Sequence, residues 1–321
     1  MSIRAIDMRA AVDIASNLGN MQQIHWRLKD NEKEYPEIRK RARCGISEGL
    51  VKLEFPNLTI AYISFYHLAT PNHKAIPANL IPSGEQQDPF STALRKLSQS
   101  PKLKSLTLSG VIDPSFFWPS SSSPSNNQTT WPSLEMLHVT FDITAPSGKW
   151  YFERPPVGWL YDPSAGDDST PAWENAAMDS RLDSTSLTSD DHFDEFNPLK
   201  TFYFVRSAPD NDTLTPLLEA MAKAAAQMPQ LQEISLSTYL EAKRMEWGVS
   251  YYAPGQASRV TLQGEADELL KRRLYWDVGA WRAEPNLRAL WRKVHGDSGV
   301  EMVERFLSRS TRTARPRYIG L

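Results

Sequence analysis

The stretch Pro101-Lys-Leu-Lys-Ser-Leu-Thr-Leu108 decides the fold that this sequence predicts. Proline lacks a backbone N–H and clashes with a preceding helical turn, so Pro101 ends a helix, and Leu103 is the first apolar anchor after it. Leu106 and Leu108 are two residues apart, which places them on one face of a β-strand and Thr107 on the other. The stretch therefore predicts the end of a helix followed by a short strand with one buried face.

The same order of residues recurs along the chain: Pro, any, Leu, any two, apolar, any, apolar. Residues 132–139 and 229–236 repeat it in full, and residues 56–63, 197–204 and 19–26 are weaker copies. Composition alone would rarely produce this string, so the copies indicate a structural repeat. Such units cannot bury their apolar faces alone, and stacking them forms a continuous core.

Apolar residues at helical spacing precede several copies. One set is Leu217, Met221, Ala224 and Met228, before the copy at 229–236. A helix followed by a strand, repeated along the chain, implies parallel strands joined by right-handed crossovers. The sequence therefore predicts an α/β fold, an elongated and irregular solenoid of about six or seven short parallel strands with helices on the convex side.

The copies are unevenly spaced, so loops must carry the excess residues. We expect one domain over residues 1–321, with loop inserts at about 110–131 and 146–196. The second insert carries several large aromatic residues, and we expect some of them to dock on the body of the protein. A helical cap is predicted at about 283–307, followed by a frayed tail at 308–321.

Three elements are predicted in the C-terminal part. Residues 274–278 indicate one more strand, residues 285–294 a helix with Leu287 and Trp291 inward, and residues 300–307 a final short helix.

Alternation along the strands also predicts which side chains lie opposite the core anchors. The candidate protein-contact residues are His25, Thr107, His138, Tyr203 and Ser235. A register error of one residue would reverse this assignment, since successive side chains of a strand point to opposite faces.

Composition limits the class of protein. The chain has 321 residues, 40% of them hydrophobic, and a net charge of −2, which fits a globular protein with a sizeable core. No apolar run is long enough to span a membrane, and charged residues interrupt the first 18 positions, so we expect neither a membrane anchor nor a secretory signal. The single cysteine, Cys44, excludes an internal disulfide. These features predict an intracellular protein, cytoplasmic or nuclear.

The sequence contains few candidates for a catalytic or ligand-binding site. The sequence lacks a phosphate-binding glycine loop, a dinucleotide-binding glycine triplet and a Gly-x-Ser-x-Gly elbow. His67 and His73 are too far from other ligands to favour a metal site, and Cys44 fits a packed thiol better than a reactive one. The basic segment 271–317 could bind nucleic acid, but it matches no nucleic-acid-binding motif. We predict no catalytic residue, no metal and no cofactor.

Several strings support a resemblance to a known family: Trp26-Arg-Leu-Lys-Asp-Asn-Glu-Lys33, Ser98-Gln-Ser-Pro-Lys-Leu103, Phe117-Trp-Pro119, Trp131-Pro-Ser-Leu134, Pro146-Ser-Gly-Lys-Trp-Tyr-Phe152 and Trp276-Asp-Val-Gly-Ala-Trp-Arg282. The chain resembles the irregular leucine-rich-repeat proteins of a large fungal F-box-type family, over residues from about 15 to about 307. The resemblance implies a leucine-rich-repeat-like solenoid that recognises protein partners, and a Skp-type adaptor and a cullin as further partners. An F-box needs about 40–50 residues before the repeats, and only about 18 precede the first repeat strand here.

The predicted function is therefore protein–protein recognition, in one form as the substrate receptor of a cullin-type ubiquitin ligase. Three alternatives remain: a stand-alone scaffold without a role in ubiquitination, an enzyme with its site in the 146–196 insert, and a copy without a retained role. An enzyme would require titratable groups that converge in a pocket, for example His192 with two acidic residues.

Overall fold

A computed structural model provides the structure of the chain. It describes residues 8–30, 35–66, 73, 76–119, 130–154, 206–240, 245–258 and 268–307.

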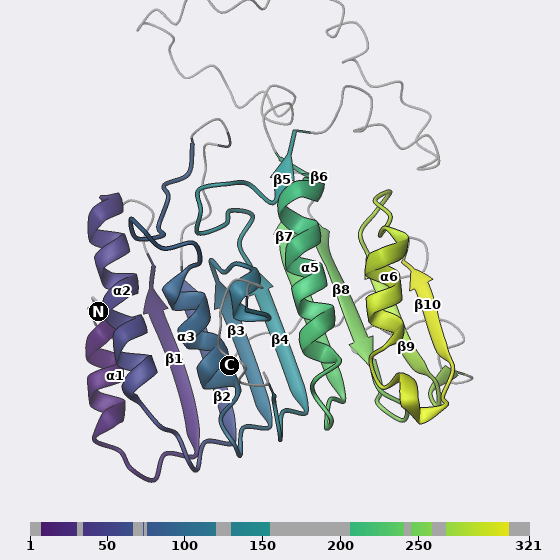
Figure 1. Cartoon of the computed structure of the whole chain (residues 1–321), viewed down its shortest axis with the longest axis horizontal. Helices are drawn as coiled ribbons and strands as arrows, with labels where there is room; N and C mark the ends of the chain where they lie inside the picture. Colours follow the sequence, from purple (N-terminus) through teal and green to yellow (C-terminus); the bar gives the residue numbers. More distant parts are fainter. Residues whose placement is uncertain are drawn as a thin grey trace, which may run out of the picture.

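The described residues form one sheet of eight strands, in the order β1-β2-β3-β4-β7-β8-β9-β10, and the separate pair β5-β6. The strands of the large sheet are β1 (Gln23–Lys29), β2 (Ile60–Tyr66), β3 (Ser105–Gly110), β4 (Met136–Phe141), β7 (Glu233–Leu240), β8 (Met245–Tyr252), β9 (Arg272–Asp277) and β10 (Met302–Phe306). The fold is thus mixed α/β with a mostly parallel sheet, as the repeat predicts. Strand order follows chain order, because each unit packs beside the one before it (Figure 1).

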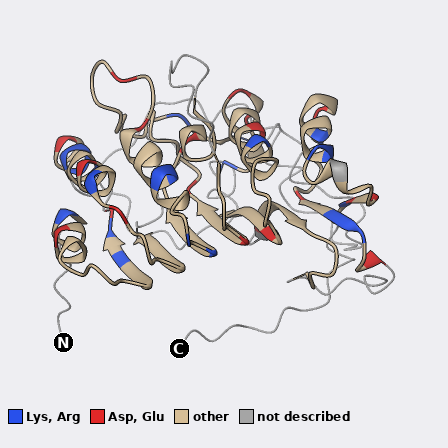
Figure 2. Ribbon diagram, turned by 60° about the horizontal axis from the view of Figure 1, so that its bottom comes forward, with Lys and Arg blue, Asp and Glu red and all other residues tan. Residues whose placement is uncertain are grey.

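All the described α-helices lie on one side of this sheet (Figures 1 and 2). They are α1 (Met8–Ser16), α2 (Pro36–Lys52), α3 (Pro89–Ser98), α5 (Asn211–Ala225) and α6 (Pro285–Arg292), with short 3-10 turns η1 (Pro114–Phe116) and η5 (Gly296–Ser298). Two of the helices begin at an aspartate that caps the first turn: Asp88 accepts from the backbone N–H of Ser91, and Asp210 from that of Asp212.

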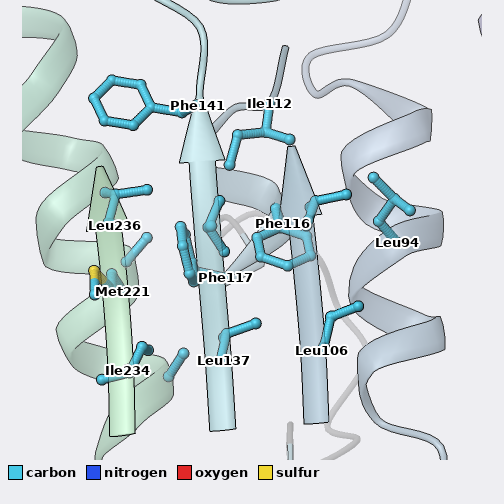
Figure 3. Close-up of a cluster of buried hydrophobic side chains, with 14 of the residues drawn as sticks. Leu94, Leu106, Ile112, Phe116, Phe117, Leu137, Phe141, Met221, Ile234 and Leu236 are labelled. Carbon is cyan, nitrogen blue, oxygen red and sulfur yellow. The ribbon is translucent and has the colours of Figure 1, made fainter. Parts of the chain in front are cut away.

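The repeat positions form the core between the helices and the sheet. In the unit that begins at Pro101, Leu103, Leu106 and Leu108 are buried, as predicted. Figure 3 shows the corresponding leucines and isoleucines of β3, β4 and β7 pointing to the same side, where they meet residues such as Leu94 and Met221 from α3 and α5. Parallel strands therefore bury one apolar stripe each, and the helices cover it.

The unit between β3 and β4 has a 3-10 turn where the other units have a helix. η1 contacts both α3 and α5, and Phe116 and Phe117 fill the space between those two helices (Figure 3). The described ends of the first insert, predicted at 110–131, supply core residues, since Trp131 is also buried. Residues 120–129 lie outside the described residues.

Strand β8 corrects the prediction that all strands are parallel. It runs antiparallel to both β7 and β9, and the repeat pattern does not mark it as a strand. Trp247, Val249 and Tyr251 alternate toward the core, so β8 carries the strand period without the preceding helix and proline that mark the repeat units.

The final short helix predicted at 300–307 is wrong. Residues 302–306 form β10, an edge strand parallel to β9. Phe306 stacks on Trp276 with ring centroids 5.8 Å apart, and Glu304 accepts from the indole N–H of Trp276, so side chains two apart share one face. Five residues are too few to separate a helical period from a strand period. Helix α6 and strand β9 are where the sequence predicts them.

The start of the second insert docks on the body of the protein. Tyr151 and Phe152 are buried, and the Tyr151 hydroxyl donates to the carbonyl of Ile112 at 2.7 Å. Strands β5 (Phe152–Glu153) and β6 (Ala208–Pro209) pair antiparallel and bring residues from the two sides of this insert together. The repeat copy predicted at 197–204 lies outside the described residues. Within the described ranges, no helix has the length and apolarity needed to cross a membrane.

Candidate functional site

One face of the large sheet has no described helix over it, and we name it the open face. Its middle row consists of side chains that are neighbours in the strand register: His25, Tyr62, Thr107, His138, Ser235, Ser250, Tyr275 and Arg305. Parallel sheets are usually covered on both faces, so a face of a mostly parallel sheet over which no described helix lies is a distinctive feature.

Four of the five predicted contact residues belong to this one row. His25 is exposed and packs edge-to-face on Tyr62 with ring centroids 4.6 Å apart. Thr107 and Ser235 are half-buried, and His138 is 8% exposed. The fifth, Tyr203, lies outside the described residues.

A second row of the open face lies one step toward the carboxyl ends of the parallel strands. It consists of Arg27, Ser64, Ser109, Thr140, Ser237, Gly248 and Asp277. Gly248 is required by close packing, because a Cβ there would lie 2.5 Å from the carbonyl oxygen of Leu236. The centre of the open face is therefore lined by short hydroxyl side chains, which can donate and accept hydrogen bonds without projecting far.

His138 has polar neighbours that resemble, but do not form, a nucleophile–base–acid relay. Its Nδ1 lies 2.9 Å from the hydroxyl of Ser235 and 3.7 Å from a carboxylate oxygen of Glu233. A relay needs the hydroxyl and the carboxylate at opposite nitrogens of the ring, whereas both meet Nδ1 here. This geometry suits a hydrogen-bonded group that is fixed in position within the sheet.

In the part of the open face formed by β1 to β4, the charged side chains lie on β1. Arg27 and Lys29 of β1 are exposed, and no carboxylate of the described residues lies within ion-pair distance of either (Figure 2). The rows contributed by β2, β3 and β4 contain Ser, Thr, Tyr, Met, Ile and His but no acidic residue. The β1 side of the open face is therefore positively charged.

A pocket of about 240 Å³ opens where β2, β3, β4 and β7 end. Ser64, Ser109 and Thr140 of the second row form part of its wall, together with Arg206 and Asp142. Ligands of open α/β sheets commonly bind at the carboxyl ends of the strands, which makes this position notable.

A cluster of buried charges lies beyond the ends of β1 and β3, and its cations and carboxylates pair with one another. Arg43 donates to Asp30 at 3.1 Å and to Asp88 at 2.7 Å, and Arg39 donates to Asp30 at 2.5 Å. Asp113 accepts from the backbone N–H of Asp88, and burial, together with the charge of Asp88, raises the pKa of the Asp113 carboxyl. Because Arg43 is 2% exposed, we interpret the cluster as a support for α2, α3 and η1.

The other candidate positions that the structure describes are Cys44, His73 and the arginines of the basic segment. Burial and the charges of Asp88 and Glu48 raise the pKa of the Cys44 thiol, which opposes a reactive thiolate. No group of metal ligands occurs within the described ranges. His67, which the sequence does not favour as a metal ligand together with His73, lies outside them, as does His192. In the basic segment, Arg272 and Arg273 are buried and Arg288 pairs with Glu304.

The residues predicted from the sequence do not include four of the middle row, Tyr62, Ser250, Tyr275 and Arg305, or the arginine of the pocket. Tyr62, Ser250 and Tyr275 each lie one residue from a core anchor of β2, β8 or β9, so alternation along those strands would find them. Arg305 lies in the segment that the sequence predicts as a helix. Arg206 carries no motif, because it enters the pocket from a segment that follows the repeat copy at 197–204.

No protein-family model, curated protein or solved structure matches this chain. Its function must therefore be inferred from the geometry of the open face and of the pocket.

Proposed function

We propose that the protein recognises a protein partner on the open face, as a leucine-rich-repeat-like solenoid does on the strand side of its repeats. The observation that carries the proposal is the hydroxyl-lined face of a mostly parallel sheet that has no described helix over it, whereas helices cover the other face.

The partner that fits is a protein segment with acidic residues over β1 and hydrogen-bonding groups over β2, β3 and β4. Arg27 and Lys29 supply the complementary positive charge, and Ser64, Thr107 and Ser109 supply donors and acceptors. Exposed complementary charges steer association and fix register more than they add affinity. Hydroxyl side chains lose little rotamer entropy on contact, which favours them at the centre of such a surface.

The finer form of the proposal is a substrate receptor of a cullin-type ubiquitin ligase. Its support is the sequence resemblance to fungal F-box-type proteins, together with the alternation of helices and strands that such receptors would share. In this form the open face would bind the substrate, and a Skp-type adaptor would bind elsewhere.

Affinity purification of the tagged chain from its native cells, with quantitative mass spectrometry, tests the proposal. The informative variant is Thr107→Arg with Ser109→Arg, which places two long charged side chains at the centre of the open face. The matched control is Glu219→Arg on helix α5, on the covered side of the sheet.

We expect the face variant to lose the partner and the control to keep it, with both variants folded by circular dichroism. Recovery of the same partner by the face variant would refute the proposal. Stoichiometric recovery of a Skp-type adaptor and a cullin with the wild-type chain would support the ligase form, and their absence would remove it.

A further inference from the structure

The pocket at the carboxyl ends of β2, β3, β4 and β7 has a charged group whose donors are not all used by the protein. Arg206 is half-buried in its wall, and its Nε donates to the carbonyl of His73 at 3.1 Å. Within the described residues, its two terminal nitrogens have no hydrogen-bond or ion-pair partner. An arginine presents its N–H donors in a planar fork, so those of the terminal nitrogens remain available here.

Packing fixes the position of this guanidinium. Its central carbon lies 4.6 Å from the ring centroid of Trp150, and the Trp150 ring stacks on His73 with centroids 5.5 Å apart. The backbone N–H of Arg206 donates to Nδ1 of His73 at 3.0 Å, which holds the two residues together. A preorganised fork binds a carboxylate at a smaller entropic cost than a free side chain would.

The electrostatics around Arg206 favour an anion with a single charge. Burial, and then the neighbouring charge of Arg154, lowers the pKa of the Arg206 guanidinium. The carboxylates of Glu153 and Asp210 oppose this pKa shift more weakly. A further negative charge at the guanidinium would stabilise its charged form. Asp142 also lines the pocket and accepts from the hydroxyl of Thr144 at 2.6 Å. Asp142 repels any anion in the pocket, and it repels a dianion such as a phosphate more strongly than a carboxylate with a single charge.

The rest of the wall is largely apolar. Phe65, Phe141, Ile143 and Leu240 line it, and the hydroxyls of Ser64, Ser109 and Thr140 lie on one side. The volume of about 240 Å³ corresponds to roughly eight water-sized groups at about 30 Å³ each, which is the size of a small organic molecule. Ligand sites commonly combine such apolar walls with a few fixed polar groups.

We propose that this pocket binds a small organic carboxylate, with the carboxylate on the terminal nitrogens of Arg206 and an apolar body against Phe65, Phe141 and Leu240. The second row of hydroxyls would hydrogen-bond the polar edge of the ligand. The pocket shares Ser64 and Ser109 with the surface proposed for the protein partner. It holds a different kind of ligand, and the test below measures carboxylate binding in the absence of any partner, so its result does not depend on the proposed protein contact.

The test uses benzoate as the probe, with benzamide as the neutral molecule of the same size and shape. The full chain is labelled with 5-fluorotryptophan, and the ¹⁹F resonance of Trp150 is assigned by Trp150→Phe. We expect benzoate to shift the Trp150 resonance with a dissociation constant at least about tenfold lower than that of benzamide, since a charge-assisted hydrogen bond is worth about 1.5–3 kcal/mol.

Two variants test whether Arg206 causes the preference for benzoate over benzamide. Arg206→Gln should abolish the preference for benzoate, while Arg154→Gln, the matched control, should keep it. Phenyl phosphate should bind more weakly than benzoate. Equal binding of benzoate and benzamide, an unchanged preference in Arg206→Gln, or no shift of the Trp150 resonance at millimolar benzoate would each overturn the proposal.

Discussion

Two arginines at the same end of the sheet have opposite environments. Arg43 is buried and donates to two carboxylates, Asp30 and Asp88. Arg206 is half-buried, packs on Trp150, and has no carboxylate partner among the described residues. A buried charge whose donors are used supports the fold, whereas one whose donors face a pocket can serve a ligand. Substitutions should separate these two roles.

The largest effect is expected from Arg43→Met. This change leaves Asp30 and Asp88 buried with fewer partners, and breaking a buried ion pair costs about 3–5 kcal/mol. Urea denaturation followed by circular dichroism measures the loss, and Arg41→Met on the exposed side of α2 is the control, with a change within about 0.5 kcal/mol. A loss below about 1 kcal/mol for Arg43→Met would contradict the structural role that we assign to the buried ion pairs of Arg43.

The next largest loss of stability is expected on the helix-covered face of β3, and a much smaller one on its open face. Leu108→Ala removes a fully buried side chain from the helix-covered face and should destabilise the protein by about 2–5 kcal/mol. Thr107→Ala, one residue away on the open face, should cost less than about 1 kcal/mol. Thermal unfolding of both variants measures the difference, and similar losses would show that the two faces are not differently covered.

A third prediction concerns Asp113, whose carboxyl belongs to the buried charge cluster. Its pKa is raised in the folded state, so the native protein binds this proton at a higher pH than the unfolded chain does. Asp113→Asn removes a carboxylate oxygen that accepts from the N–H of Asp88, which should cost about 1–3 kcal/mol near pH 7.

The stability gap between wild type and Asp113→Asn should widen as the pH falls through the raised pKa and should level off below about pH 3.8. Denaturation at several pH values measures this gap. A gap that narrows at low pH would contradict the raised pKa.

Among Arg43, Asp113 and Arg206, the smallest loss of stability is expected from a substitution of Arg206. Arg206→Gln should lower the free energy of unfolding by about 1 kcal/mol, because it loses the hydrogen bond to the carbonyl of His73 and the contact with Trp150 but leaves no buried carboxylate of the described residues without its partner. Differential scanning calorimetry measures this change. A loss comparable to that of Arg43→Met would show that Arg206 also supports the fold.

Local signals in the sequence predict much of the fold. Leu106 and Leu108, or Ile234 and Leu236, combine the strand period with a helix stop just before it, and these units are placed correctly. Strand β8 lacks the stop signal, and β10 is too short for its period to be recognised. The strand conformation of β10 depends on pairing with β9 and on the contact between Phe306 and Trp276, which are tertiary interactions.

The sequence predicts less of the candidate site than of the fold. Side chains on the open face follow from alternation within each strand, which is why His25, Thr107, His138 and Ser235 share a row. The pocket is different, because its wall combines the ends of four strands with His73 and Arg206, which are 133 residues apart. No local pattern encodes that proximity.

Site-specific photo-cross-linking tests directly whether the open face is the recognition surface. A benzophenone amino acid at Thr107 on the open face is compared with the same group at Glu219 on helix α5, in native cells. We expect a discrete protein adduct from position 107 and none from position 219. An adduct from position 219 alone would contradict this assignment.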